Sequence, residues 1–324
     1  MKDPQYTTFT DHAEGPCVVS IGTFDGVHRG HQHLLAKVRE RATELGLSSL
    51  VVTFEPTPVQ LFNPDLFKGR LMTPERKLKL IGACGIDRVI MLPFTREFAK
   101  LSPEEFMAQL VAQVQPVELW VGSDFALGHG RTGNVDRLGE IGAELNLTVN
   151  AVDRIDFDGM AVSSSAIRNL IAEGHVEVAD RLLGQPYEIS GEVIRGSQVG
   201  RTIGYPTANV ALPESLVLPA DGIYVAHARI EGERQERPAM TYIGTRPALN
   251  TGSRLIETHL IDFDDDLYGK QLTTLFVKHL RPDSDFAGVE SLVAQLRQDE
   301  VDTRKALQMP PKASDISNVT LGLH

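Results

Sequence analysis

The stretch that decides the fold of the first half is CVVSIGTFDGVHRGH, residues 17–31. It opens with an apolar run, passes through a loop containing Gly22 and Gly26, and leads into an amphipathic segment. A helical spacing relates His31, Leu34, Leu35, Val38, Ala42 and Leu45, and Gly46 follows where a helix can end. The stretch therefore predicts a strand, a glycine-rich loop and a helix, in that order.

Further strands and helices alternate along the same half. Short runs rich in Val, Ile and Leu occupy residues 17–22, 48–54, 88–94, 117–122 and 147–152. Ser102-Pro103-Glu104-Glu105 has the residues of a capping box with proline at the first helical position. This order predicts a doubly wound parallel sheet with helices on both faces, which binds ligands at the carboxyl ends of its strands.

The pattern changes near Gln185-Pro186. Two predicted helices, near residues 164–173 and 175–183, precede this point. After it, strand-like runs are separated by Gly, Pro and Asp turns, at residues 187–196, 222–230, 237–244, 255–262 and 271–280. They predict an antiparallel sheet or small barrel, followed by a helix over about 286–297. We therefore expect domains at 1–184 and 185–308 and a flexible tail at 309–324.

The bulk composition limits the class of protein. The chain has 324 residues, a formal net charge of −11, and two cysteines, Cys17 and Cys84, without metal-ligand spacing. The negative charge disfavours a surface that coats nucleic acid. No apolar run approaches the roughly 20 residues that span a bilayer, and the polar N-terminus lacks a signal core. We expect a cytoplasmic protein with free thiols.

Candidate chemistry in the first half lies in three segments. His28 and His31, three residues apart at a helix start, can face phosphate oxygens together. The loop 121–133 follows the fourth predicted strand, where ligand contacts are expected. In 162–168, the serines can cap a helix or donate to phosphate, and Arg168 can grip a pyrophosphate. A glycine-rich turn with surface histidines, and simple helix capping, are the alternatives.

The second half offers two further candidates. Thr207 and Asn209, two residues apart in Pro-Thr-Ala-Asn, place hard oxygen ligands on one face, as Mg²⁺ prefers. Glu257 lies in the middle of a predicted strand among apolar neighbours, where a carboxylate is unusual unless it is paired or functional. A polar turn and an exposed strand face are the respective alternatives.

Several motifs in this order carry a family resemblance. GTFDGVHRGH (22–31), TFEPTP (53–58), GSDF (122–125) and SSAIR (164–168) resemble the first domain of bacterial bifunctional riboflavin kinase/FAD synthetases. GRTIGYPTAN (200–209), IETHLIDF (256–263) and LYGK (267–270) resemble their second domain. The resemblance covers about residues 18–305. It implies an N-terminal Rossmann-like nucleotidylyltransferase domain and a C-terminal antiparallel β-barrel kinase domain.

The resemblance also implies the reactions and the roles of residues. Riboflavin would be phosphorylated by ATP to FMN, and FMN adenylylated by ATP to FAD, with Mg²⁺. His28 and His31 would stabilise the α-phosphate, Ser164 and Arg168 would hold the triphosphate, and Glu257 would be the base for riboflavin. Thr207 and Asn209 would position Mg²⁺ and ATP. The nucleotide-binding set would be Gly22, Phe24, Asp25, Gly26, Asp124, Ser164, Ser165, Gly200, Arg201, Thr207 and Asn209.

This chain departs from the family pattern at Thr57, Leu127, Ser165, Tyr242 and Ala248. Thr57 stands where the family often has histidine, so the adenylyl step could be slower. A chain that keeps one activity, a nucleotidylyltransferase for another substrate and a non-catalytic flavin sensor are the rival hypotheses. Rates, reversibility, oligomeric state and channelling of FMN stay open.

Overall fold

A computed structural model describes residues 15–196, 198–212, 215–245 and 254–310. The chain divides into two compact units, the first ending at Ala166 and the second beginning at Ile167. Within the described ranges, no helix has both the length and the apolar character needed to cross a bilayer. Residues 311–324 of the predicted tail, and Ala248, lie outside the described residues.

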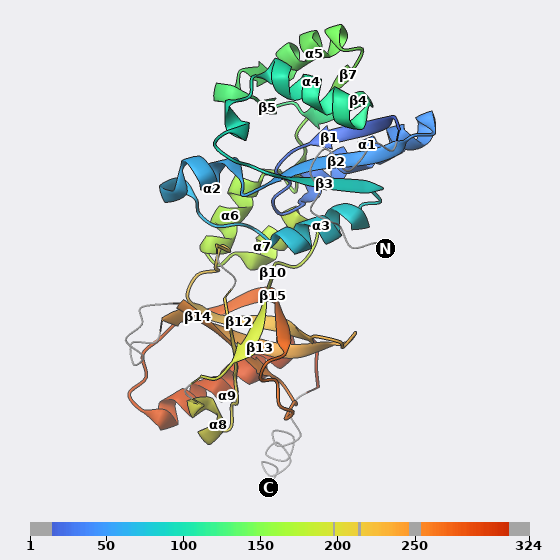
Figure 1. Cartoon of the computed structure of the whole chain (residues 1–324). Coiled ribbons are helices and arrows are strands. Elements are labelled where there is room, and N and C mark those ends of the chain that lie inside the picture. The colour runs from blue at the N-terminus through green and yellow to red at the C-terminus, as the bar shows by residue number, and fades with distance from the viewer. Residues whose placement is uncertain (1–14, 197, 213–214, 246–253, 311–324) are drawn as a thin grey trace. The chain divides into compact units, whose positions relative to one another are not determined.

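The first unit is built on a five-stranded parallel sheet in the order β3-β2-β1-β4-β7 (Figure 1). The strands are β1 (Cys17–Ile21), β2 (Ser48–Glu55), β3 (Arg88–Pro93), β4 (Pro116–Gly122) and β7 (Thr148–Val152). The order reverses between β1 and β4, both of which pair in parallel. In sheets of this kind the reversal point opens a crevice at the carboxyl ends of the strands. The predicted doubly wound sheet is confirmed.

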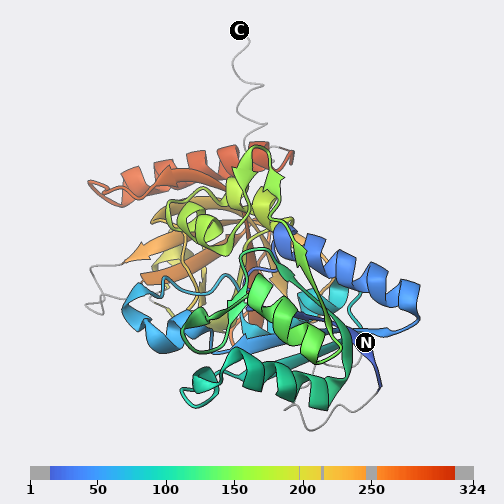
Figure 2. The same ribbon diagram turned by 90° about the horizontal axis from the view of Figure 1, so that it is seen from above.

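Helices cover both faces of this sheet, because its strands carry apolar side chains on both faces. Val18 and Val51 pack with α1 (Arg29–Leu45) and α3 (Pro74–Ala83) on one face. Val19 and Leu50 pack on the other face with α4 (Pro103–Val114) and α5 (Val135–Glu144). The view from above separates α1, in blue, from α4, in teal (Figure 2).

The capping residues predicted for these helices act as expected. Gly46 ends α1 in the left-handed conformation, and Ser102 and Glu105 form the predicted capping box of α4. The structure adds several short elements to those predicted: α2 (Pro58–Phe62), η2 (Pro64–Leu66), η3 (Phe98–Lys100), η4 (His129–Arg131), the hairpin of β5 (Ala126–Leu127) with β6 (Gly133–Asn134) and the hairpin of β8 (Asp156–Phe157) with β9 (Met160–Ala161).

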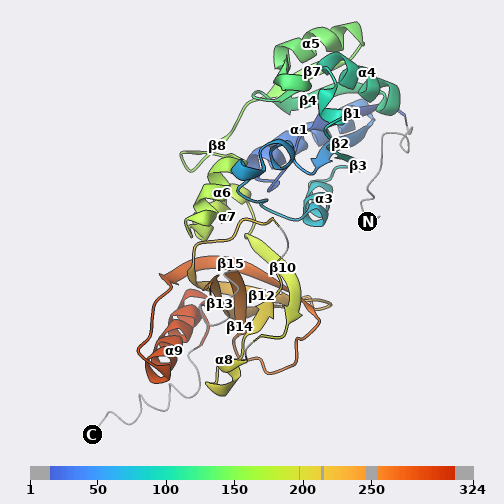
Figure 3. The ribbon, with the colours of Figure 1, turned by 60° about the vertical axis from the view of Figure 1, so that its left-hand side comes forward.

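The second unit contains a closed barrel in the order β10-β11-β14-β13-β12-β15 (Figure 3). Its strands are β10 (Glu188–Ile194), β11 (Ala208–Val210), β12 (Gly222–Ile230), β13 (Glu236–Thr245), β14 (Arg254–Leu260) and β15 (Gln271–Pro282). All six pairings are antiparallel, and the pairing of β10 with β15 closes the ring. The predicted small barrel is confirmed.

In the described part of the second unit, four helices accompany the barrel: the greater part of α6 (Ser164–Ala172), α7 (Val176–Leu183), α8 (Val199–Thr202) and α9 (Val289–Ala306). α7 packs against β15, and α9 packs against β12, β13 and β15. The last helix is longer and lies further along the chain than the predicted 286–297. The division into compact units falls at 166/167, whereas the predicted functional boundary at 184/185 stays a prediction.

A chain of buried hydroxyl groups shows which strand faces point into the barrel. Thr258 Oγ1 lies 3.1 Å from Thr241 Oγ1 on the neighbouring strand and 3.0 Å from Thr274 Oγ1. Thr274 belongs to β15, which does not pair with β14, so this contact crosses the interior. Because side chains alternate along a strand, Glu257 lies on the other face of β14.

Candidate active sites

The loop between β1 and α1 is the first candidate site, at the carboxyl edge of the sheet. Phe24 and Val27 have positive φ angles of 49° and 37°, as does Gly26 at 88°. For Phe and Val this conformation is strained, and such strain persists only where surrounding contacts enforce it. The loop is therefore held in one shape by its neighbours.

Three other segments hold the loop through hydrogen bonds. The backbone N–H of Leu71 donates to both carboxylate oxygens of buried Asp25, at 3.0 and 3.1 Å. Ser164 Oγ donates to the Asp25 carbonyl at 2.8 Å, and Thr53 Oγ1 donates to the Thr23 carbonyl at 3.1 Å. Asp25, predicted as a nucleotide ligand, thus has both side-chain oxygens engaged by the protein. Its observed role is to fold the loop.

His28 and His31 come together at the start of α1. Their rings stack with centroids 3.6 Å apart and planes 15° from parallel. His28 is the N-cap of α1, and its Nδ1 accepts from the backbone N–H of His31 at 3.3 Å. In a neutral His28 the ring proton is then on Nε2. A Cβ on Gly30 would lie 3.2 Å from the His28 ring, which explains the small residue between the histidines.

His31 is kept neutral by its surroundings. Burial lowers its pKa well below the ordinary value, and the neighbouring charges of His28 and Lys77 lower the pKa further. Its Nδ1 atom is buried and has no hydrogen-bond partner among the described residues. An uncharged imidazole stabilises phosphate oxygens through its N–H, and no net charge is involved.

The other predicted ligands of the first unit differ in exposure. Asp124, directly after β4, is exposed and forms an ion pair with Arg154, whose hydrogen bond lowers the pKa of Asp124. Ser163, one of the serines of 162–168 for which capping was an alternative, caps α6 by accepting from Ala166 N–H at 3.2 Å; it does not belong to the predicted nucleotide-binding set. Ser165 is exposed. Arg168 follows Ser164 by one turn of α6 and is half-buried.

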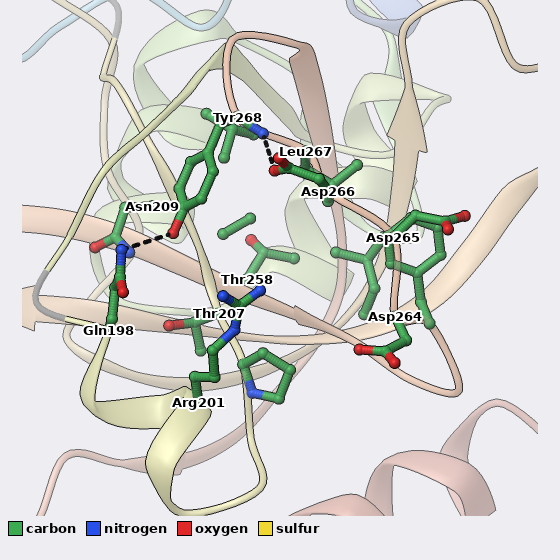
Figure 4. A pocket seen from close by; sticks show the side chains of 15 residues that line it. Gln198, Arg201, Thr207, Asn209, Thr258, Asp264, Asp265, Asp266, Leu267 and Tyr268 are labelled. Carbon is green, nitrogen blue, oxygen red and sulfur yellow. Dashed lines mark hydrogen bonds between the residues drawn. The ribbon is translucent and has the colours of Figure 1, made fainter.

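The second candidate site is a pocket at the barrel (Figure 4). It brings together three predicted residues, Arg201, Thr207 and Asn209, with residues that the sequence analysis did not single out. The described residues lining it are Val193, Gln198, Arg201, Pro206, Thr207, Ala208, Asn209, Thr258, Leu260, Phe263, Asp264, Asp265, Asp266, Leu267 and Tyr268. Two loops, 198–207 and 263–268, therefore face each other across the pocket.

Gly200 shapes the first of these loops. A Cβ at this position would lie 2.2 Å from the Tyr205 carbonyl oxygen, and Tyr205 N–H donates to the Gly200 carbonyl at 2.8 Å. The loop closes on itself so tightly that only glycine fits. Opposite, Gln198 Nε2 donates to the Tyr268 hydroxyl at 3.4 Å, which links the two loops.

Glu257 is not among the residues that line this pocket. It is 4% exposed and lies opposite Asn209 in the β11–β14 register and opposite Tyr242 in the β13–β14 register. Directly opposed residues share one face of a sheet, so Glu257 and Asn209 are neighbours. The predicted base is thus beside the predicted magnesium ligand, on the strand face opposite to pocket-lining Thr258.

Comparison with known proteins matches the two parts of the chain to two separate family models. A family model described as FAD synthetase matches residues 10–166, and one described as riboflavin kinase matches residues 183–307. The bifunctional riboflavin kinase/FMN adenylyltransferase of Pseudomonas fluorescens is 41% identical over 91% of this chain and 94% of its own length. That of Escherichia coli (strain K12) is 38% identical over 89% of this chain and 92% of its own length.

A solved structure shares the whole architecture. A crystal structure described as a macrolide-efflux protein from Streptococcus pneumoniae is 31% identical and covers 91% of this chain and 96% of its own, with a TM-score of 0.83. The description of that protein differs from those of the curated relatives, which agree with both family models and with the motifs in both units. On these grounds the chain belongs to the family of bifunctional riboflavin kinase/FMN adenylyltransferases.

Proposed function

We propose that the barrel forms FMN from riboflavin and ATP, and that the parallel-sheet unit then forms FAD from FMN and a second ATP. The chain is an enzyme with both transferase activities, as its family membership states. The observation that carries the proposal is that each family model coincides with a separate architecture bearing its own phosphate-binding features. Riboflavin, FMN, FAD and ATP are accordingly its small-molecule partners.

In the kinase step, the 5′-hydroxyl oxygen of riboflavin attacks the γ-phosphorus of ATP. A new P–O bond forms, the bond from the γ-phosphorus to the β,γ-bridging oxygen breaks, and ADP leaves. Glu257 accepts the hydroxyl proton. Its burial and its position opposite Asn209 support this role, because a base has to lie beside the nucleotide phosphates yet away from bulk water.

Mg²⁺ accompanies ATP in this proposal. The described residues contain no cluster of three or more His, Cys, Asp or Glu side chains that could hold a metal ion by themselves. Thr207 and Asn209 instead offer one hydroxyl and one amide oxygen in the pocket. That donor set fits an ion that keeps several waters and shares phosphate oxygens, since Mg²⁺ dehydrates reluctantly. When bound, Mg²⁺ would neutralise charge on the phosphates.

In the adenylyl step, a phosphate oxygen of FMN attacks the α-phosphorus of ATP. The bond to the α,β-bridging oxygen breaks and pyrophosphate leaves. The attacking oxygen is already anionic, so positioning and charge stabilisation carry the step. We assign these tasks to His28 and His31, with Gly22, Gly26 and the N-terminus of α1 approaching the phosphates.

The remaining assignments are also proposals. Asp124, Ser164, Ser165 and Arg168 complete the adenylyl site, and Gly200 and Arg201 the kinase site. We place the functional boundary at 184/185, supported by the kinase family model that begins at residue 183. The absence of a membrane-crossing helix from the described residues supports a cytoplasmic location.

The test is turnover by the purified chain. Riboflavin with Mg-ATP should give FMN and then FAD, resolved by chromatography, and pyrophosphate should appear in step with FAD. Supplied FMN should give FAD without riboflavin. If FMN accumulates and never becomes FAD, the chain retains only the kinase; if neither product forms, it is a flavin-binding protein.

A further inference from the structure

Lys77 is a buried cation that no predicted role explains. It lies in the first turn of α3 and is 3% exposed. Lysine is almost never this buried unless it is paired, because removing its charge from water is costly. Neighbouring Lys79 on the same helix is exposed, so α3 itself does not require a buried lysine.

The ammonium group of Lys77 joins two strand ends. Nζ donates to the Phe54 carbonyl at 3.1 Å, near the end of β2, and to the Thr23 carbonyl at 3.3 Å, just after β1. Its third donor faces Glu55, whose Oε2 lies 3.8 Å away. An ammonium has three donors, and here two bind backbone and the third lies towards a carboxylate. The group is therefore engaged by the protein itself.

The Thr23 carbonyl belongs to the strained loop that leads to the histidines. That oxygen also accepts from Thr53 Oγ1, so β2 and α3 both hold it. The loop continues through Phe24 and Val27, in their left-handed conformations, to His28, the N-cap of α1. Fixing the carbonyl of Thr23 thus fixes the start of the segment that places both imidazoles.

Several charged groups face the cation. Glu55 and Asp25 favour the protonated form of Lys77, whereas burial, which is the larger effect, and Arg70 lower its pKa. Glu55 keeps a second partner, because Arg70 lies 2.7 Å from its Oε1. His31 in turn is faced by His28 and Lys77, which both lower its pKa in addition to burial.

We propose that Lys77 is a positioning residue of the adenylyl-transfer site, whose ammonium clamps the ends of β1 and β2 and keeps the His28–His31 pair in its reactive arrangement. This inference rests on the proposed adenylyl function. Lys77 acts through the loop and touches neither FMN nor ATP. Its charge has a second effect, which is to keep His31 neutral over a wider pH range.

The experiment compares Lys77→Met, Lys77→Arg and, as matched control, Lys79→Met in the full-length chain. Met keeps the length and removes the charge, and Glu55 is left with Arg70. FAD formation from FMN is measured from pH 5.5 to 9, with kcat and KM separated; riboflavin phosphorylation in the same samples reports on the barrel. Melting curves report on folding. Wild-type FAD formation is established first, so that failure of the proposed function itself is seen separately.

We expect Lys77→Met to lower kcat for FAD formation on the order of 10²-fold, the effect of a small misplacement of catalytic groups. KM values and riboflavin phosphorylation should stay near wild type. Without the Lys77 charge the pKa of His31 rises, so the acidic limb of the rate profile should move to higher pH. Lys77→Arg keeps the charge but not the shape, so it should leave that limb in place and recover part of kcat.

Two outcomes would overturn the inference. Lys77→Met with wild-type kcat and pH profile would show that the clamp does not position the histidines. Equal loss of both activities in Lys77→Met and Lys77→Arg, together with a lowered melting temperature, would show that Lys77 only maintains the fold. Lys79→Met should match wild type in every measurement.

Discussion

The β1–α1 loop and the barrel pocket both surround ATP phosphates in the proposed function, yet different parts of the molecule hold them. The loop is held from within the sheet edge, by Thr53, Leu71 and Lys77. The pocket loops are tied to α9, which packs against the barrel. Tyr205 donates to Glu300 at 3.2 Å, and Arg304 pairs with both Glu300 and Asp262.

Because of this difference, mutations in the supports of the two sites should have different consequences. In the first unit the supporting groups come from β2, from α3 and from the segment before α3, and they hold backbone at the sheet edge, so altering one shifts the loop while the core remains packed. In the second unit the supports are charged residues shared between a helix and two loops. Altering them should change stability and nucleotide affinity together.

The largest expected effect is on the kinase. Glu257→Gln keeps the size of the side chain but cannot accept a proton, so FMN formation should fall by about 10²–10⁴-fold. Conversion of supplied FMN to FAD should remain, measured in the same preparation. Exposed Glu231→Gln is the control. Phosphorylation of riboflavin at the wild-type rate by folded Glu257→Gln protein would exclude Glu257 as the base. The barrel would then have no catalytic group assigned to it.

The corresponding change in the adenylyl-transfer site is His31→Ala. It removes one donor to the developing phosphate charge, so FAD formation should fall by about 10²–10³-fold while riboflavin phosphorylation is kept. His33, exposed on the same helix, provides the control His33→Ala. The rates of both reactions are measured with each variant. An unchanged rate of FAD formation in His31→Ala would contradict the assignment of the stacked pair.

A smaller effect is expected from changing the α9 residues that support the pocket loops. Glu300→Gln weakens a buried charge pair but leaves Arg304 with Asp262, so the free energy of unfolding should fall by about 2–3 kcal/mol. The KM of the kinase for ATP should rise, because Tyr205 closes the loop that carries Thr207. Urea unfolding and initial rates measure both. Exposed Glu290→Gln on the same helix is the control; a changed KM at wild-type stability would contradict the shared support.

The same α9 residues show where sequence reasoning stops. Its predicted range ended near residue 297 because the apolar spacing ends there, yet Asp299, Glu300, Thr303 and Arg304 are buried. The three charged residues are buried because ion pairs neutralise them: Arg281 is 2.8 Å from Asp299, and Arg304 pairs with Glu300 and with Asp262. A pattern of hydrophobic residues cannot reveal such pairing.

Local signals, in contrast, predicted most of the first unit. The sequence signals for β1 (Cys17–Ile21), for the glycine-rich loop and for the end of α1 at Gly46 lie close together in the chain. These elements could therefore be predicted from the sequence. α3 and its buried Lys77 were missed, because a lysine in a charged helix suggests exposure. Asp264–Asp266 are exposed, and they also line the pocket. Only the fold brings these residues opposite Arg201.

The smallest expected effect on catalysis concerns how α7 joins the barrel within the second unit. Asp180 Oδ1 accepts from the backbone N–H of Tyr187, one residue before β10, at 2.6 Å. The pKa of Asp180 is raised to about 7, mainly by burial; the Tyr187 hydrogen bond opposes the shift and nearby Glu177 adds to it. Because the pKa lies above the ordinary value of 3.8, the folded state binds the proton more tightly than the unfolded chain.

This stabilising contribution is complete below about pH 4 and is lost as the pH rises towards 7. Asp180→Asn keeps an oxygen that accepts from Tyr187 but removes the ionisation. The variant should therefore match wild type in unfolding free energy near pH 4 and exceed it at pH 8 by up to about 4 kcal/mol, because each pKa unit corresponds to about 1.36 kcal/mol. Urea unfolding at both pH values measures the difference. Burial lowers the pKa values of His31 and His279, so their contributions to the free energy of unfolding are lost in the opposite direction, as the pH falls. This loss is the same in both proteins. Subtracting the two curves therefore isolates Asp180, and parallel curves would contradict its raised pKa. Since Asp180 touches neither candidate site, both catalytic rates should be unchanged, in contrast to Glu300→Gln in the same unit.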